Sequence, residues 1–194
     1  ETVEAPAWPH AVDAGLAKQG KALFNKHCAD CHGTYGPGAI YPDKIVPIET
    51  LGTDRTRLDA LTPEERKTYS TSWFTGYEPK GVRTDPGGYV APPLDGVWAS
   101  APYFHNGSVP TLWHVLRSKE RPALWKRSHH GYDKERVGLA FEVLDDPASV
   151  PTERSARRQW FDTSKPGKSR AGHTFPDRLT EAQKRAVLEY LKTL

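Results

Sequence analysis

The sequence predicts a mainly α-helical fold with long loop insertions and a small β-hairpin. Three observations support this: an amphipathic segment near the N-terminus, a well-capped helix at the C-terminus, and a long loop-rich stretch between them. The 194 residues include 17 Pro and 16 Gly, and only 37% are hydrophobic, which suits a loop-rich protein. The length is that of a single domain.

The first helix is expected to start near Asp13, a good N-cap residue, and to end at about Lys26. Gly in a helix interior is about 1 kcal/mol less favourable than Ala, so we expect Gly20 to permit a close contact with another helix. Residues 1–12 are expected to form a surface arm, and residues 13–194 a single domain. The helix presents the following residues on one face at 3.6-residue spacing: Leu16, Gly20, Leu23 and Phe24.

The stretch directly after this helix reads C-x-x-C-H at residues 28–32, which is the attachment signature of c-type haem. Two thiols on one helical turn, Cys28 and Cys31, can each bond a vinyl group of one porphyrin, and His32 is then placed as the proximal iron ligand. The chain has only 2 Cys, so a zinc site would lack further thiol ligands, and a thioredoxin-like pair would require a βαβ context. We therefore expect one covalently bound haem c.

The last helix is expected to begin after Thr180, which forms a capping box with Gln183. An apolar stripe follows it. An N-terminal helix that leads into a haem motif and a C-terminal helix that closes the chain form the frame of a class I cytochrome c, in which the two helices cross. The residues that fit the small and aromatic positions at that crossing are Gly20, Phe24 and either Tyr190 or Leu191.

Between these helices the sequence predicts a large insertion with only short elements. Thr62 caps a short helix that opens with Pro63, and another short helix is expected over residues 112–117. Apolar residues alternate over residues 137–143, which indicates a strand, and residues 160–163 could pair with it as the hairpin.

Composition restricts the compartment and the partners. The net charge of +3 is modest and the basic residues are scattered, so we expect no nucleic-acid partner, and no apolar run is long enough to span a membrane. The chain contains no Met, so we expect a processed product or a fragment whose leader is absent. Haem is attached to this motif outside the bacterial cytoplasm, which predicts a periplasmic or extracellular location.

The ligand opposite His32 cannot be Met, because the chain has none. The iron is therefore bound by His, bound by another side chain such as Tyr or Lys, or left open. We favour His173, which lies in a Gly-bearing loop just before the capped final helix; His105 and an open or otherwise liganded iron remain alternatives. The other histidines are expected elsewhere: His10 in the arm, His27 on the wrong side of the motif, His114 in the core, and His129 and His130 in a polar loop.

The segment APYFHNGSVPTL, residues 101–112, resembles the P-Y-F-H-[DN]-G-x-x-x-T-L motif of the bacterial di-haem cytochrome c peroxidase superfamily. Residues 172–175 and 191–194 resemble its C-terminal haem domain, and the sequence is most similar to the branch that contains the haem-dependent rubber oxygenases. The resemblance implies that Cys28 and Cys31 hold the haem and that His32 is proximal. His173 would stand where the peroxidases have Met and the rubber-oxygenase branch has His, and His105 would be a structural residue near the haem.

Members of this superfamily carry two haems, with the catalytic one in an N-terminal domain, whereas this chain has one C-x-x-C-H and resembles the electron-transferring half. We therefore predict an electron-transfer protein with one bis-His, low-spin haem c. Its partner would be a redox protein or a separate or cleaved catalytic haem domain. The alternative is a monohaem peroxidase or oxygenase with a displaceable or absent distal ligand and His105 as an acid–base group. An open site would also allow a gas sensor.

Four carboxylates in loops are candidates for holding a structural cation, and the sequence leaves this open, although the simpler interpretation is preferred. The candidate carboxylates match no calcium-loop spacing and are interpreted as solvated turn residues. They are Asp43, Asp54, Asp85 and Asp95.

Overall fold

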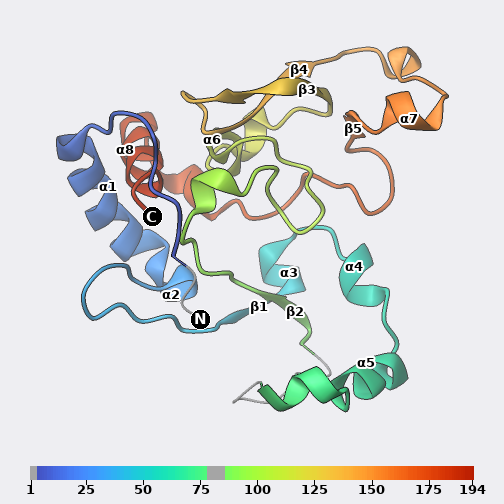
Figure 1. Ribbon diagram of the computed structural model, residues 1–194, viewed down its shortest axis with the longest axis horizontal. Helices are drawn as coiled ribbons and strands as arrows, with labels where there is room; N and C mark the ends of the chain where they lie inside the picture. The colour runs from blue at the N-terminus through green and yellow to red at the C-terminus, as the bar shows by residue number, and fades with distance from the viewer. Residues whose placement is uncertain (1–3, 78–85) are drawn as a thin grey trace.

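The computed structural model describes residues 4–77 and 86–194 of the chain. Within these ranges, eight α-helices and five strands form a mixed fold rather than a mainly α-helical one (Figure 1). The expectation was too narrow because the long segment between the terminal helices contains two small sheets and not a single hairpin. Six of the helices are short: α2 (Ala29–His32), α3 (Ile48–Leu51), α4 (Thr56–Asp59), α5 (Pro63–Ser70), α6 (Leu112–Val115) and α7 (Arg154–Arg157).

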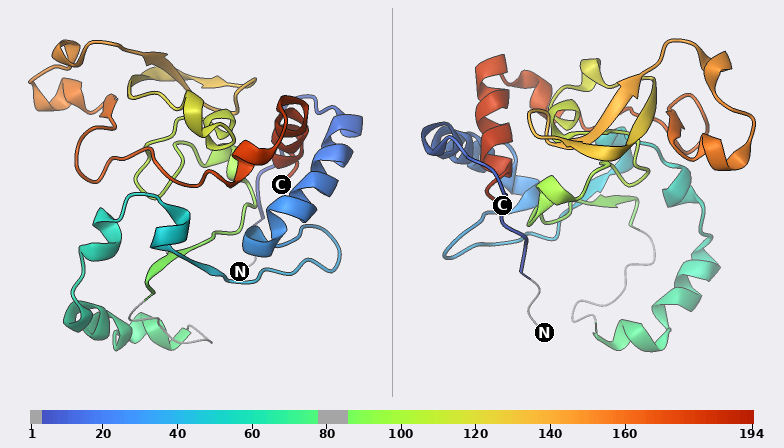
Figure 2. Two further views of the ribbon diagram at one scale, coloured as in Figure 1. Left: turned by 180° about the vertical axis from the view of Figure 1, so that it is seen from behind. Right: turned by 45° about the horizontal axis from the view of Figure 1, so that its top comes forward.

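The two longest helices, α1 (Ala14–His27) and α8 (Glu181–Leu191), lie side by side, and the views of Figure 2 show them together at one end of the molecule. Both begin as the sequence predicts. The Asp13 side chain accepts a hydrogen bond from the Leu16 amide at 2.9 Å, and the capping box of Thr180 and Gln183 is complete. The backbone amide of Asp13 also donates to Glu189 Oε1 at 2.8 Å, which links the two helices.

The closest approach of α1 and α8 occurs at Gly20. A Cβ atom added there would lie 1.9 Å from the carbonyl oxygen of Ala186, so no larger residue fits without moving the backbone of α8. One turn further along, Phe24 packs edge-on against Tyr190 with the ring centroids 5.4 Å apart. The crossing expected from the sequence, with Gly20, Phe24 and Tyr190 in contact, is confirmed.

Two small antiparallel sheets occupy the long insertion. β1 (Ile45–Pro47) pairs with β2 (Gly88–Val90), and the second sheet has the order β4-β3-β5. The strand expected over residues 137–143 is β4 (Gly138–Val143), but its hairpin partner is β3 (Leu124–Asp133). The segment expected to complete the hairpin forms β5 (Trp160–Asp162), which pairs with β3 instead.

The polar character of β3 explains why the sequence did not reveal it. Its residues read LWKRSHHGYD, without regular alternation, and its register with β4 shifts between Arg127 and Tyr132. His129 and His130, expected in a polar loop, fall within this irregular strand. A strand with a bulge does not keep the period-2 pattern from which strands are recognised.

The core lies between the terminal helices, α6 and the second sheet. Val109 and Val137 are completely buried, and Val187 of α8 is 1% exposed. His114 of α6 is buried as well, with Nδ1 2.6 Å from the hydroxyl of Thr111. The expectation that His114 is a satisfied core histidine is confirmed.

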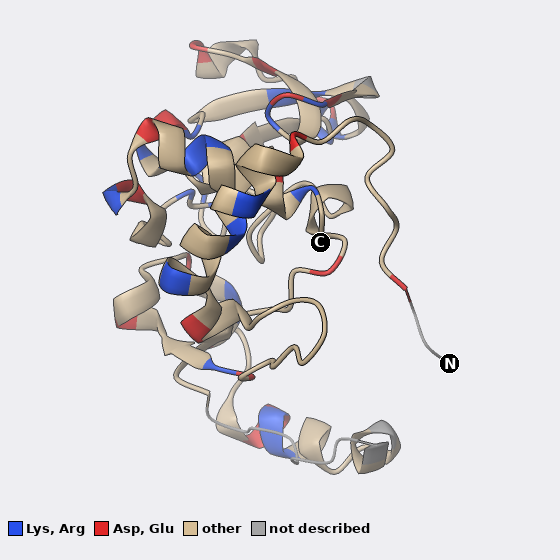
Figure 3. Ribbon diagram, turned by 90° about the vertical axis from the view of Figure 1, so that its left-hand side faces the viewer, with Lys and Arg blue, Asp and Glu red and all other residues tan. Residues whose placement is uncertain are grey.

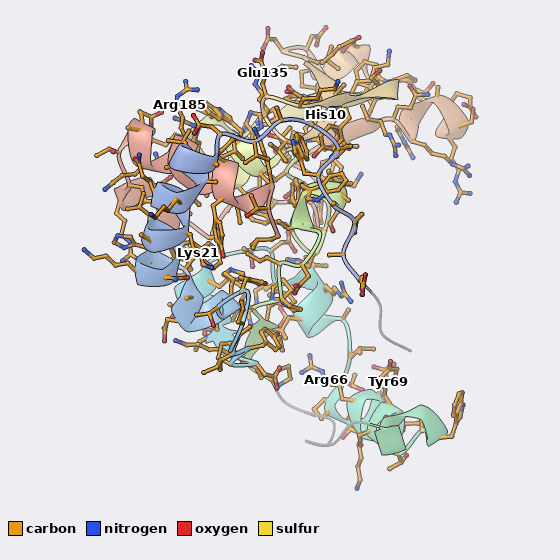
Figure 4. All side chains as sticks on the ribbon, turned by 60° about the vertical axis from the view of Figure 1, so that its left-hand side comes forward. His10, Lys21, Arg66, Tyr69, Glu135 and Arg185 are labelled. Carbon is orange, nitrogen blue, oxygen red and sulfur yellow. The ribbon has the colours of Figure 1, made fainter. Side chains whose placement is uncertain are left out.

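Two segments lie outside this core. In the N-terminal arm, Trp8 packs edge-on against Trp98 at a centroid distance of 5.3 Å, so the arm lies on the body of the protein. The segment that carries α4 and α5 projects away from the body, with Arg66 and Tyr69 labelled on it in Figure 4. None of the helices in the described ranges could span a lipid bilayer.

Substitution of Gly20 tests the helix crossing. We expect Gly20→Ala to lower the free energy of unfolding by about 2–3 kcal/mol, because the new methyl group meets backbone atoms of α8 that cannot move aside. Gly15→Ala is the matched control in the same helix, since a Cβ there approaches only Asp13 Oδ1, at 3.4 Å. The control should be neutral or up to about 1 kcal/mol more stable in denaturant unfolding. Equal losses for both variants would contradict the assignment of the crossing.

His114 predicts part of the acid sensitivity of the fold. Burial, followed by the charge of Arg136, lowers its pKa from 6.5 to about 4. The unfolded chain therefore binds more protons between these values, and the free energy of unfolding falls as the pH falls from about 6.5 to about 4. The contribution amounts to roughly 3 kcal/mol. His114→Gln should reduce the difference in stability between pH 7 and pH 4 by about that amount; an unchanged difference would show that His114 is not its source.

Candidate functional site

The C-x-x-C-H motif lies where α1 ends and turns into α2. The amide of Cys28 donates to the carbonyl oxygen of Phe24 at 2.8 Å, and the amides of Cys31 and His32 donate to the Cys28 carbonyl oxygen at 3.1 and 3.0 Å. Both thiols are free rather than joined in a disulfide. Burial raises the pKa of the Cys28 thiol to about 11, so it is protonated at neutral pH.

The imidazole of His32 is oriented by the segment after β2. Its Nδ1 lies 2.9 Å from the carbonyl oxygen of Pro92. A carbonyl only accepts hydrogen bonds, so Nδ1 carries the proton and Nε2 keeps the lone pair that a metal requires. Burial lowers the pKa of His32, which favours the neutral ring.

Tyr35 joins the same two segments at a second point. Its hydroxyl donates to the carbonyl oxygen of His32 at 3.0 Å and accepts from the amide of Leu94 at 2.6 Å. The sequence alone did not predict this role. Nothing in a Tyr just after the motif indicates which distant backbone groups its hydroxyl will contact. The two contacts place residues 92–94 against the motif.

The ring that faces His32 is that of His173. The ring centroids are 6.1 Å apart and the planes are inclined by 67°. A metal ion bonded to one nitrogen of each ring would fit between them. The sum of two metal–nitrogen bonds of about 2 Å and of the centroid-to-nitrogen distance in each ring matches this separation. Burial, and then the charges of His32 and Arg121, lower the pKa of His173 to about 4, so the ring is neutral at physiological pH. The donor set of two free thiols and two opposed neutral imidazoles fits haem c.

The loop that carries His173 is held by its backbone and by aromatic neighbours. His173 adopts a positive φ of 46°, which is uncommon outside glycine, and its amide donates to the carbonyl oxygen of Leu51 at 2.7 Å. The rings of Phe104 and Phe175 lie edge-on to His173 at centroid distances of 6.0 and 5.6 Å. The imidazole thus stands in an apolar surrounding.

The other distal candidate, His105, has a different neighbour. Its ring stacks on Tyr89 of β2 at a centroid distance of 4.3 Å and an angle of 23°. Its Nε2 is buried and has no hydrogen-bond partner among the described residues. The structure therefore places His105 on the strand pair of the insertion, whereas His173 occupies the place across from His32.

Among residues 4–77 and 86–194, no group of three or more His, Cys, Asp or Glu side chains could hold a separate metal ion. Asp54 accepts hydrogen bonds from the amides of Thr56 and Ser169 at 2.9 and 3.1 Å, which is the behaviour of a turn carboxylate. Asp85 lies outside the described residues.

Comparison with protein families identifies the class of the domain. The family described as cytochrome C oxidase, cbb3-type, subunit III matches residues 15–76, which include α1 and the C-x-x-C-H motif. The family described as RoxA-like, cytochrome c-like matches residues 88–126, which include the Pro92 segment and α6. The chain therefore contains a cytochrome c domain, the class of protein that binds covalently attached haem c. This domain is related to the RoxA-like branch, in agreement with the resemblance seen in the sequence.

Two curated relatives from Sinorhizobium fredii extend the comparison. The chain is 33% identical over 193 residues to the uncharacterized protein y4iM and 27% identical over 256 residues to the uncharacterized protein y4iJ. These alignments cover 86% and 97% of this chain but only 43% and 41% of the relatives. The chain thus spans about two fifths of the length of the curated relatives it matches.

Proposed function

We propose that this domain transfers electrons through one haem c that is held by Cys28 and Cys31 and ligated on both sides, by His32 and His173. The observation that carries the proposal is the 6.1 Å separation of the two imidazole centroids. With His32 and His173 both bound to the iron, no position would remain for peroxide or dioxygen, and the haem would supply Fe(III)/Fe(II) cycling.

The protein's own residues support this role by keeping both imidazoles neutral and by orienting that of His32. The Pro92 carbonyl selects the His32 tautomer, and burial opposes protonation of both rings. Imidazole is a better donor to ferric iron than a thioether, so we expect a lower reduction potential than that of a His/Met cytochrome.

The charge distribution supports docking of an acidic redox partner at α1. This helix contains Lys18, Lys21 and Lys26 and no Asp or Glu, and Figure 3 shows the basic residues along the helices at this end of the molecule. Lys21 is labelled on α1 in Figure 4. Because α1 runs directly into the C-x-x-C-H motif, a partner attracted to these lysines would dock beside the haem attachment site.

We place this domain in the periplasm or outside the cell, where haem is attached to C-x-x-C-H motifs. The partner would be a redox protein or a catalytic haem domain, either separate or cleaved from a longer chain. The greater length of the curated relatives is consistent with such a second part.

Carbon monoxide distinguishes this function from a peroxidase or oxygenase. We expect the spectrum of the ferrous holoprotein to be low-spin and unchanged by carbon monoxide, because both axial positions are closed. His173→Ala should become high-spin and bind carbon monoxide. His105→Ala is the matched control and should behave as the parent protein does, since its ring stacks on Tyr89.

Two results would count against the proposal. A His173→Ala protein with an unaltered low-spin spectrum would remove His173 as the distal ligand. Rapid binding of carbon monoxide or peroxide by the parent protein would favour a monohaem peroxidase or oxygenase instead, with His105 as the candidate acid–base group.

A further inference from the structure

A buried arginine, Arg121, lies just after η3 (Ser118–Glu120) and is only 3% exposed. Its guanidinium group donates five hydrogen bonds, all to backbone carbonyl oxygens. Two of the acceptors, His114 and Val115, belong to α6, at 3.0 and 3.2 Å. The other three belong to the loop that carries the candidate distal ligand: Arg170 at 2.8 Å, Gly172 at 2.6 Å and His173 itself at 3.2 Å.

This side chain therefore connects α6 to the loop at residues 170–173. The guanidinium also lies 4.7 Å from the ring centroid of Phe104, and Phe104 in turn packs edge-on against the imidazole of His173. A planar fork with donors in fixed directions can hold several carbonyl groups at once, which a single ammonium group cannot do.

The opposite side of the loop is held by the end of α3. Gly172 has a positive φ of 79°, and a Cβ atom added there would lie 2.3 Å from the backbone of both Gly52 and Thr53. The amide of His173 donates to Leu51 on the same side. The loop is thus enclosed between the end of α3 and the Arg121 guanidinium.

Burying a cation is costly unless its hydrogen-bonding capacity is fully used. At Arg121 the backbone carbonyls provide that capacity, and most of them lie on the His173 loop. Such a residue would be replaceable by an apolar one if it served packing alone. The planar guanidinium of Arg121, in contrast, fits the positions of the carbonyl groups that it joins.

We propose that Arg121 is a positioning residue that fixes the 170–173 loop so that His173 stays across from His32 and excludes external ligands from the iron. This inference rests on the proposed function. In this proposal Arg121 keeps the 170–173 loop rigid on the His173 side of the iron and does not itself contact the haem.

Arg117 provides a matched control. It is nearly as buried as Arg121, at 4% exposed, and lies on the same stretch of chain. Its guanidinium pairs with Glu120 at 3.4 Å and with Glu181 of α8, and it packs 3.6 Å from the ring centroid of Trp113. None of these partners is a residue of the 170–173 loop.

The test uses the holoprotein with Arg121→Lys, Arg121→Gln and Arg117→Lys. The parent protein should show no carbon monoxide binding in the ferrous state, which sets an upper limit on its binding rate. Lys keeps the charge of Arg but loses the fork, so Arg121→Lys should bind carbon monoxide at a rate at least about tenfold above this limit, since the loss of one charge-assisted hydrogen bond corresponds to a change of at least about tenfold. A high-spin component should appear in its ferric spectrum. Arg117→Lys should lower thermal stability but keep the spectrum and the carbon monoxide rate of the parent protein.

Arg121→Gln provides a second measurement if the Lys variant does not fold, and should also bind carbon monoxide faster. A reactive Gln variant beside an inert Lys variant would assign the effect to charge rather than to the fork, and would overturn the proposal. Equally fast carbon monoxide binding by Arg117→Lys would overturn the proposal too, because the substitution of any buried arginine would then have the same effect.

His173→Ala separates this inference from the proposed function. If His173→Ala becomes high-spin while both Arg121 variants match the parent protein, the ligand assignment stands and the role of Arg121 fails. If His173→Ala keeps the low-spin spectrum, the proposed function itself fails.

Discussion

The close crossing of α1 and α8 is the constraint on which the candidate site depends. α1 continues directly into the C-x-x-C-H motif, and α8 is preceded by the loop that carries His173. Because Gly20 has no side chain, its backbone meets the backbone of Ala186, and Phe24 and Tyr190 fill the space beside it. Segments at opposite ends of the chain are thereby brought to the same side of the core, and a looser crossing would separate the two imidazoles.

Within that frame, the site depends on the neutral state of the two imidazoles and on the orientation of His32 more than on charged groups. The Pro92 carbonyl orients His32, while burial opposes protonation of both His32 and His173. A buried imidazolium pair at this separation would be strongly unfavourable, so the site is consistent with a pair of neutral ligands. The nearby cation, Arg121, is hydrogen-bonded to carbonyl oxygens of the loop. Burial lowers the pKa of Arg121 to about 10, and the charge of Asp177 acts in the opposite direction.

Elements with local signals could be predicted from the sequence. Asp13, Thr62 and Thr180 cap the helices that follow them, because a side-chain oxygen binds an amide only two or three residues away. The strands were harder to predict. β1 pairs with β2 across a long intervening segment, and β3 is polar and irregular, so neither the pairing nor the order β4-β3-β5 is encoded in any short window.

The features of the site likewise separate into those with a local sequence signal and those without one. By itself, the sequence determined the C-x-x-C-H chemistry, the absence of Met as a ligand and the beginnings of the principal helices, since these depend on residue identity and on neighbours within a turn. Only the tertiary structure decided that His173 faces His32 while His105 stacks on Tyr89, and that Arg121 joins α6 to the distal loop. Those relations depend on how separate elements pack, and side-chain directions across such contacts follow from the assembled core.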